Sequence, residues 1–162
     1  ETGLNHEGII SGKFLYVNEK LSTCHLVLEY SNFPNLSRFI KQQMREHKKI
    51  DETLIATIID QLLDIVAYLH EEGCCHRDIK PENILYHEIT EDVKLIDFEI
   101  ARMPKYKHQA LEMMTNTGTL HYRAPESFSG ELYDERIDVW AVGVTAYELL
   151  TGKVPFEAEY EK

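Results

Sequence analysis

The octapeptide HRDIKPEN at residues 76–83 places an aspartate, a lysine and an asparagine close together in one polar stretch. Before it, apolar side chains recur at helical spacing and stop at Gly73. After it, the apolar run Ile84–Tyr86 has the composition of a short strand. The octapeptide is therefore expected to be a polar loop between a buried helix and a buried strand, where a rigid scaffold can hold functional side chains.

Three more polar motifs follow the octapeptide in the chain. Asp97-Phe98 comes directly after a second short apolar run, the nonapeptide GTLHYRAPE occupies residues 118–126, and Asp138-Val139-Trp140 opens an apolar stretch. Each motif alone would be weak, because aspartates are common in turns and helix caps. Their order and spacing together are specific.

With these four motifs the chain resembles the catalytic domain of eukaryotic Ser/Thr protein kinases, and the calcium/calmodulin-dependent kinases are the suggested subgroup. The resemblance implies an α+β, protein-kinase-like fold that is only partly present. Residues 1–30 would form the end of the small β lobe and the hinge. Residues 31–162 would form most of the mainly helical large lobe, truncated before its last helices.

The resemblance implies ATP-dependent phosphorylation of Ser or Thr residues in protein substrates. Asp78 would accept or orient the proton of the substrate hydroxyl. Lys80 would lie beside the transferring phosphate, and a lysine here is typical of Ser/Thr-directed relatives. Asn83 and Asp97 would supply the hard oxygen ligands that Mg²⁺ prefers. ATP and Mg²⁺ are therefore the expected cofactors.

The family's nucleotide site also has counterparts in this chain. Leu28, Glu29 and Ser31 fall at the gatekeeper and the hinge, whose backbone groups would bind adenine. Leu85 would lie beneath the adenine. Two other residues are expected to serve in packing: His76 and Phe98.

By resemblance, residues 97–126 form the activation segment, which explains a long polar stretch without periodicity. Thr115 lies where many relatives carry an activating phosphate, and Thr117 is the nearby competitor. A phosphate there would pair with Arg77 through charge-assisted hydrogen bonds.

Three residues match substrate-binding positions: Glu82, Thr119 and Glu148. In basic-directed relatives, carboxylates at the positions of Glu82 and Glu148 read an arginine upstream of the acceptor. We therefore expect a protein substrate with a basic residue before its Ser or Thr. The alternative for both glutamates is a solvated surface carboxylate.

The composition of the chain bears on which other classes of partner it could bind. With 17 Lys and Arg against 28 Asp and Glu, the net charge is −11, which argues against nucleic acid and anionic membranes as partners. No segment is expected to approach the roughly 20 apolar residues of a membrane span.

Three cysteines are an odd number and too few for a disulfide scaffold, so a reducing, cytoplasmic location is expected. The oligomeric state is left open.

The periodicity of the apolar residues predicts the secondary structure. Two strands are expected at residues 14–17 and 25–30, and two shorter ones at 84–86 and 93–96. Three helices are expected: one from Leu36 past Met44, one from an Asp51 cap to Gly73, and an almost wholly apolar one over residues 138–150 that closes at Gly152.

The chain departs from the family pattern in two ways. Glu99 replaces the glycine that follows Asp97-Phe98, which brings a negative charge near the phosphates. The Gly-rich loop, the ATP-pairing lysine and its glutamate partner do not occur in the sequence, so little activity is expected of these residues alone. Apolar surface is expected to be exposed where the missing helices would pack. The alternative function is therefore a pseudokinase or truncated scaffold without phosphoryl transfer. The presence of all four catalytic and metal-binding residues argues for the enzyme.

Overall fold

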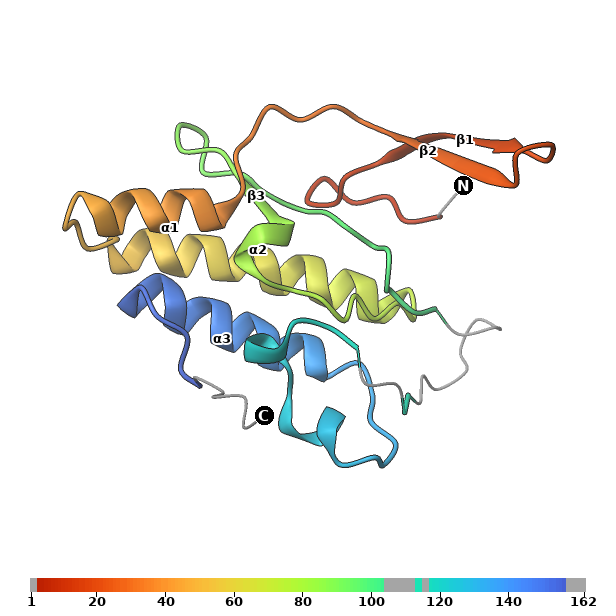
Figure 1. Ribbon diagram of the computed structural model, residues 1–162. Coiled ribbons are helices and arrows are strands. Elements are labelled where there is room, and N and C mark those ends of the chain that lie inside the picture. Colours follow the sequence, from red (N-terminus) through yellow and green to blue (C-terminus); the bar gives the residue numbers. More distant parts are fainter. Residues whose placement is uncertain (1–2, 104–112, 115–116, 157–162) are drawn as a thin grey trace.

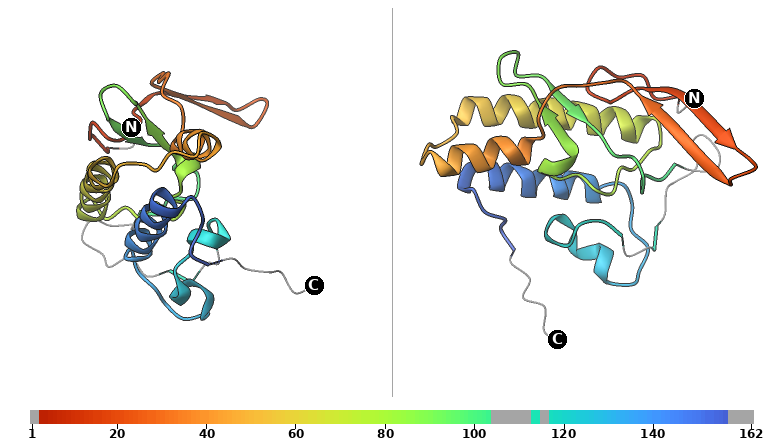
Figure 2. Two further views of the ribbon diagram at one scale, coloured as in Figure 1. Left: turned by 90° about the vertical axis from the view of Figure 1, so that its left-hand side faces the viewer. Right: turned by 45° about the horizontal axis from the view of Figure 1, so that its top comes forward.

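The computed structural model describes residues 3–103, 113–114 and 117–156. The order of the strands and helices is β1 (Gly12–Asn18), β2 (Thr23–Leu28), α1 (Leu36–Arg45), α2 (Glu52–Glu71), β3 (Ile84–Tyr86), β4 (Val93–Leu95) and α3 (Ile137–Thr151). Short 3₁₀ helices cover Pro81–Asn83, Leu120–Tyr122 and Pro125–Phe128. The expected α+β class is confirmed. The three α-helices lie side by side, while the β1–β2 hairpin projects away from them (Figures 1 and 2).

Local capping interactions explain where α2 begins and ends. The side chain of Asp51 accepts a hydrogen bond from the backbone N–H of Thr53 at 2.9 Å. This bond satisfies a donor that the first helical turn leaves without a partner. At the other end Gly73 has a φ of 74°, and the N–H of Cys74 donates to the carbonyl of Leu69 at 2.7 Å. Glycine adopts this left-handed conformation without strain, so the helix ends where the sequence predicts.

Both β-sheets are two-stranded antiparallel ribbons. β1 pairs with β2, and β3 pairs with β4 so that Leu85 faces Lys94 across the ribbon. β2 ends at Leu28, before the predicted end at Tyr30, because Leu28 forms the last pair with Gly12 and the backbone then turns to other partners. The N–H of Glu29 donates instead to the carbonyl of Ser11 at 2.8 Å.

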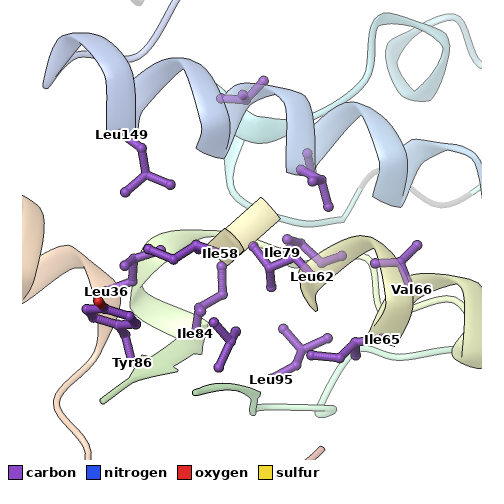
Figure 3. Packing of buried hydrophobic residues seen from close by; sticks show 14 of the residues in the cluster. Leu36, Ile58, Leu62, Ile65, Val66, Ile79, Ile84, Tyr86, Leu95 and Leu149 are labelled. Atoms are coloured by element: carbon purple, nitrogen blue, oxygen red, sulfur yellow. The ribbon is translucent and has the colours of Figure 1, made fainter. Parts of the chain in front are cut away.

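The main core lies between α2, α3 and the β3–β4 ribbon. Figure 3 shows Leu149 of α3 pointing toward the layer formed by Ile58 and Leu62 of α2, with Leu95 of β4 below this layer. Ile58, Leu62 and Leu95 are fully buried. Truncating one such side chain to alanine typically destabilises a protein by about 2–5 kcal/mol, so this layer contributes strongly to the stability of the fold.

The β1–β2 hairpin carries apolar side chains that other described residues do not cover. Phe14 is 74% exposed and Leu21 is 70% exposed. All of β2 and nearly all of β1 are exposed. Within the described residues, the hairpin thus presents an exposed apolar surface.

Helix α2 is the one helix among the described residues that is long and apolar enough to cross a membrane by length and composition. The expectation that no segment approaches a span is therefore wrong by that criterion. In the structure one face of α2 packs in the core through residues such as Ile58, Leu62 and Leu69. The core helix of a globular domain also meets this criterion, which makes it weak evidence for a membrane span.

Candidate active site

The loop formed by the octapeptide is anchored to α3 through Asp138, which is 1% exposed. Its Oδ2 accepts a hydrogen bond from the backbone N–H of His76 at 2.8 Å, and its Oδ1 accepts one from the N–H of Arg77 at 2.9 Å. The imidazole of His70 lies 3.1 Å from the same Oδ2. Arg77 has a φ of 70°, a conformation that a non-glycine residue adopts only at some energetic cost. The two bonds to Asp138 hold the loop in this shape.

The side chain of His76 joins the octapeptide loop to the segment that carries Asp97. Its Nδ1 accepts a hydrogen bond from the backbone N–H of Asp78 at 3.2 Å, and its Nε2 lies 3.0 Å from the carbonyl oxygen of Ile96. Burial lowers the pKa of His76, so the ring is neutral and the bond to Ile96 requires the proton on Nε2. The ring of Phe98 packs edge-on against His76 at 4.7 Å between centroids. The expected packing role of both residues agrees with these contacts.

The carboxylate of Asp78 is the centre of the polar site. Its Oδ2 accepts hydrogen bonds from Nζ of Lys80 at 2.6 Å and Nδ2 of Asn83 at 2.9 Å. Its Oδ1 accepts bonds from the N–H of Thr119 at 3.0 Å and from its hydroxyl at 2.7 Å. Burial on its own would raise the pKa of Asp78, but the hydrogen bonds from Lys80 and Thr119 outweigh it and hold the pKa below its usual value. Asp78 is therefore ionised at neutral pH.

A glycine lets the segment that bears Thr119 approach the octapeptide loop closely. Gly118 has a φ of 96°, and a Cβ placed on it would lie 2.5 Å from the carbonyl oxygen of Arg77. A larger residue would push Thr119 away from Asp78. With glycine there, Nζ of Lys80 also reaches the Thr119 hydroxyl at 2.7 Å.

Asn83 and Asp97 are neighbours because the backbone N–H of Ile96 donates to the carbonyl of Asn83 at 2.9 Å. The Asn83 amide nitrogen is engaged by Asp78, through its carboxylate and its backbone carbonyl at 2.9 Å. Its amide oxygen is thus the atom left to bind a cation. Asp97 is exposed. One amide oxygen and one carboxylate suit Mg²⁺, which takes few protein ligands and completes its shell with water and phosphate oxygens.

Comparison with known proteins identifies the family to which a chain with this arrangement of residues belongs. The protein kinase domain family model matches residues 2–162. The chain belongs to the protein kinase domain family. Mouse (Mus musculus) Aurora kinase C is 40% identical over 134 residues, which cover 83% of this chain and 45% of that protein. An Aurora kinase of Patiria pectinifera is 38% identical over 83% of this chain and 31% of its own length.

Human ribosomal protein S6 kinase alpha-4 is 40% identical over 72% of this kinase chain and 15% of its own length. The chain thus spans less than half of each of these relatives. They confirm the kinase resemblance, whereas the calcium/calmodulin-dependent subgroup stays a prediction.

The predicted nucleotide-binding residues of this kinase domain lie on two elements. Leu28 ends β2, and Glu29 and Ser31 follow it in the segment that leads to α1. Leu85 lies in β3, where Asn35 forms an isolated bridge with it. The hinge segment is thus attached to the ribbon that carries Leu85. The nucleotide-binding role of the four residues stays a prediction.

Glu99, which replaces the family's glycine, is exposed, and no positive φ occurs at this position. The left-handed residue in this turn is Asp97, with a φ of 65°. The glutamate therefore causes no backbone strain in this conformation. Its N–H donates to Oδ1 of Asp97 at 3.3 Å.

The structure describes only one of the two predicted phosphorylation sites. Thr115 lies outside the described residues. The Thr117 hydroxyl is buried and has no hydrogen-bond partner among the described residues. Arg77, the predicted partner of the phosphate, donates from Nε to the carbonyl of Ile100 at 2.6 Å and so already touches the segment.

The predicted substrate-reading glutamates lie near each other beside α1. Glu82 accepts a hydrogen bond from the hydroxyl of Ser37 at 3.0 Å, and Glu148 accepts one from the Tyr122 hydroxyl at 2.5 Å. Burial raises the pKa of Glu148, the bond from Tyr122 opposes this shift, and the charge of Glu82 adds to it. The third predicted substrate residue, Thr119, contacts Asp78 directly.

Sequence reasoning missed the roles of Asp138 and His70 as anchors of the octapeptide loop. The available signal was a carboxylate in the first turn of a helix that is otherwise apolar, because a buried charge needs hydrogen-bond partners. Which partners it meets is visible only in the fold.

Proposed function

We propose that the protein carrying this chain is a Ser/Thr protein kinase that transfers the γ-phosphoryl group of ATP to a protein hydroxyl. The observation that carries this proposal is the contact of one ionised carboxylate, on Asp78, with both Lys80 and Asn83. Phosphoryl transfer requires mainly positioning and charge stabilisation, and this cluster supplies both. The relatives' names support a kinase, and none of them favours the scaffold alternative.

In the proposed reaction, Asp78 orients the acceptor hydroxyl through a hydrogen bond. The hydroxyl oxygen forms a bond to the γ-phosphorus while the bond from that phosphorus to the β,γ-bridging oxygen breaks, and the electron pair leaves with ADP. The hydroxyl proton passes to Asp78. Because the pKa of Asp78 is low, it is a weak base, so its main contribution is orientation, with proton acceptance late in the reaction.

Lys80 stabilises the charge of the transferring group. Its ammonium is held between Asp78 and Thr119 at 2.6 and 2.7 Å, which fixes its position before substrate binds. Asn83 and Asp97 would hold Mg²⁺, which when bound supplies charge neutralisation at the phosphates.

A basic residue upstream of the acceptor fits the pair Glu82 and Glu148. The negative charges of these two carboxylates act on each other, so together they form a negative site that a guanidinium would neutralise. A positional peptide array tests this preference: we expect enrichment of Arg or Lys before the acceptor, and its loss in Glu82→Gln/Glu148→Gln. An array without such enrichment in the parent protein would exclude the preference.

Activation by phosphorylation at Thr115 is the second part of this proposal. The buried hydroxyl of Thr117 is poorly placed to accept a phosphate, which favours Thr115. Phosphopeptide mapping of the active protein should find Thr115 modified and Thr117 unmodified. A map with phosphate only on Thr117 would reverse this assignment.

We also propose a cytoplasmic location. All three cysteines are free thiols, and two of them are buried. Free thiols are typical of a reducing compartment. Cell fractionation with an antibody to this chain tests the location, and recovery in the secreted fraction would exclude it.

The kinase proposal is tested with the protein at its native length, incubated with Mg²⁺ and ATP labelled on the γ-phosphate. We expect label on Ser or Thr of a protein substrate and its loss in Asp78→Asn. The exposed carboxylate of Asp60 on α2 offers a control, because Asp60→Asn removes a charge away from the site. A parent protein that binds ATP but transfers no phosphate to any substrate would support the scaffold alternative instead.

A further inference from the structure

Lys94 of β4 forms an ion pair with Glu29 of the hinge segment. Its Nζ lies 2.7 Å from Oε1 of Glu29, and the two side chains are 25% and 24% exposed. The second carboxylate oxygen accepts a hydrogen bond from the hydroxyl of Ser11 at 2.7 Å. The hydrogen bonds from Lys94 and then Ser11 lower the pKa of Glu29, so the carboxylate is ionised at neutral pH. Such a partly covered, charge-assisted contact is stronger than an ordinary surface ion pair.

The ion pair lies on the same face of the ribbon as Leu85. Leu85 and Lys94 are paired across β3 and β4, and directly opposed residues of an antiparallel pair project to the same side. Their strand neighbours, Ile84 and Tyr86 in β3 and Val93 and Leu95 in β4, are buried on the opposite side. Lys94 therefore draws the hinge toward the face of the ribbon that presents Leu85.

The hinge segment is attached to the ribbon at both of its ends. At the far end, the N–H of Tyr86 donates to the carbonyl of Pro34 at 2.9 Å. At the near end, the side chain of Glu29 reaches Lys94, and a backbone bond ties Glu29 to Ser11. Ser31 lies between these two attachments. Lys94 thus provides a direct side-chain link at the near end, while the link through Ser11 remains if Lys94 is removed.

We propose that Lys94 is a positioning residue for the nucleotide: through the carboxylate of Glu29 it sets the distance and orientation of the hinge backbone relative to Leu85. Lys94 does not touch ATP in this role. The inference rests on the proposed function, because it assigns the hinge and Leu85 to adenine binding. It predicts that loss of Lys94 weakens ATP binding without affecting the protein substrate or the chemical step.

The test uses the native-length protein and the variants Lys94→Met and Glu29→Gln. Lys94→Met keeps the length of the side chain and removes its charge, and Glu29→Gln keeps the backbone groups of the hinge. For each we expect the KM for ATP to rise about fivefold, in the range that a partly covered ion pair contributes, with kcat and the KM for the peptide within about twofold. The double variant should be no worse than either single one.

Two further variants separate positioning from a general effect of charge. Lys94→Arg keeps a cation in reach of Glu29 and should restore the KM for ATP to within about twofold. Lys13 lies 4.0 Å from the same carboxylate and is 51% exposed, so Lys13→Met removes a nearby charge without breaking the close contact. It should leave the KM for ATP unchanged. The Kd for a non-hydrolysable ATP analogue, measured by calorimetry, should follow the same order.

Several outcomes would overturn the inference. An unchanged KM and Kd for the nucleotide in both Lys94→Met and Glu29→Gln would exclude positioning, and so would a change in kcat at unchanged KM. If Lys94→Met yields no folded protein, Glu29→Gln alone decides. A parent protein that neither binds ATP nor transfers phosphate would instead refute the proposed function.

Discussion

The carboxylate of Asp138 lies 2.8 Å from the backbone nitrogen of His76, although the two residues are 62 positions apart in the chain. Through this contact the first turn of α3 holds the loop that carries Asp78 and Lys80. The helix is fixed in turn by its packing against α2 (Figures 1 and 3). One buried carboxylate thus anchors the octapeptide loop to α3.

Replacing that carboxylate should destabilise the protein. Asp138→Asn puts an amide NH₂ where one of the N–H donors of His76, Arg77 or His70 needs an acceptor. We expect a loss of about 2–4 kcal/mol in the free energy of unfolding, measured by urea denaturation of the native-length protein. Asp134→Asn breaks an exposed ion pair with Arg136 and is the matched control, with an expected loss below about 1 kcal/mol. Equal effects of the two variants would contradict this role of Asp138.

Asp78→Asn should remove phosphoryl transfer while nucleotide binding remains. The amide keeps the size of the side chain but can neither accept the hydroxyl proton nor offer two oxygens to its neighbours. We expect kcat to fall by about 10²–10⁴, the usual contribution of a positioned acid or base. Steady-state kinetics and nucleotide titration measure the two properties. A variant that keeps more than a tenth of the parent kcat would rule out a direct role of Asp78.

The Thr119 hydroxyl should act through Asp78 and Lys80. Thr119→Val removes two hydrogen bonds, and we expect kcat to fall about tenfold, as for the loss of one charge-assisted bond. The same change should raise the pKa of Asp78, because a bond that lowers it is lost. The acid limb of the pH–rate profile should therefore move to higher pH.

Thr119→Ser is the control, because serine keeps the hydroxyl and should restore both kcat and the pH profile. A merely structural defect would lower kcat without moving the acid limb. That result would contradict the assigned role of Thr119.

Glu148 should stabilise substrate binding at the expense of folding. Its pKa is raised in the folded state, so the folded protein binds this proton more tightly and stability falls as pH rises from the unfolded pKa through the folded one. Glu148→Gln keeps an acceptor for Tyr122 and removes the buried charge. At pH 7 we expect the free energy of unfolding of this variant to be up to about 1 kcal/mol higher than that of the parent.

The gain from Glu148→Gln should vanish below about pH 4, where the parent carboxylate is protonated as well. Urea unfolding at pH 7 and at pH 4 provides the comparison. A variant that is less stable than the parent at pH 7 would show that the ionised carboxylate stabilises the fold.

Much of the local structure was predictable from the sequence. The apolar stripe of α2, its Asp51 cap and its Gly73 stop are local signals, and each appears in the structure where expected. The 3₁₀ turn at Pro81–Asn83 was not predicted, because a single turn carries no periodicity. The end of β2 at Leu28 was also missed, because pairing rather than composition ends that strand.

The contacts of the active site were much less predictable. The four motifs identify the family and name the residues around Asp78, but nothing in their spacing shows that Thr119 binds Asp78 across 41 positions. The link between Lys94 and Glu29 spans 65 positions and has no motif at all.

The sequence by itself determined the helices, the approximate positions of the strands and membership of the protein kinase domain family, because periodicity, caps and motifs act over a few residues. Only the tertiary structure decided which polar groups meet. Asp138 with His76, and Lys94 with Glu29, depend on how α3 and the β3–β4 ribbon pack against α2. That packing is a collective result of many buried apolar side chains, so no single stretch of sequence encodes it.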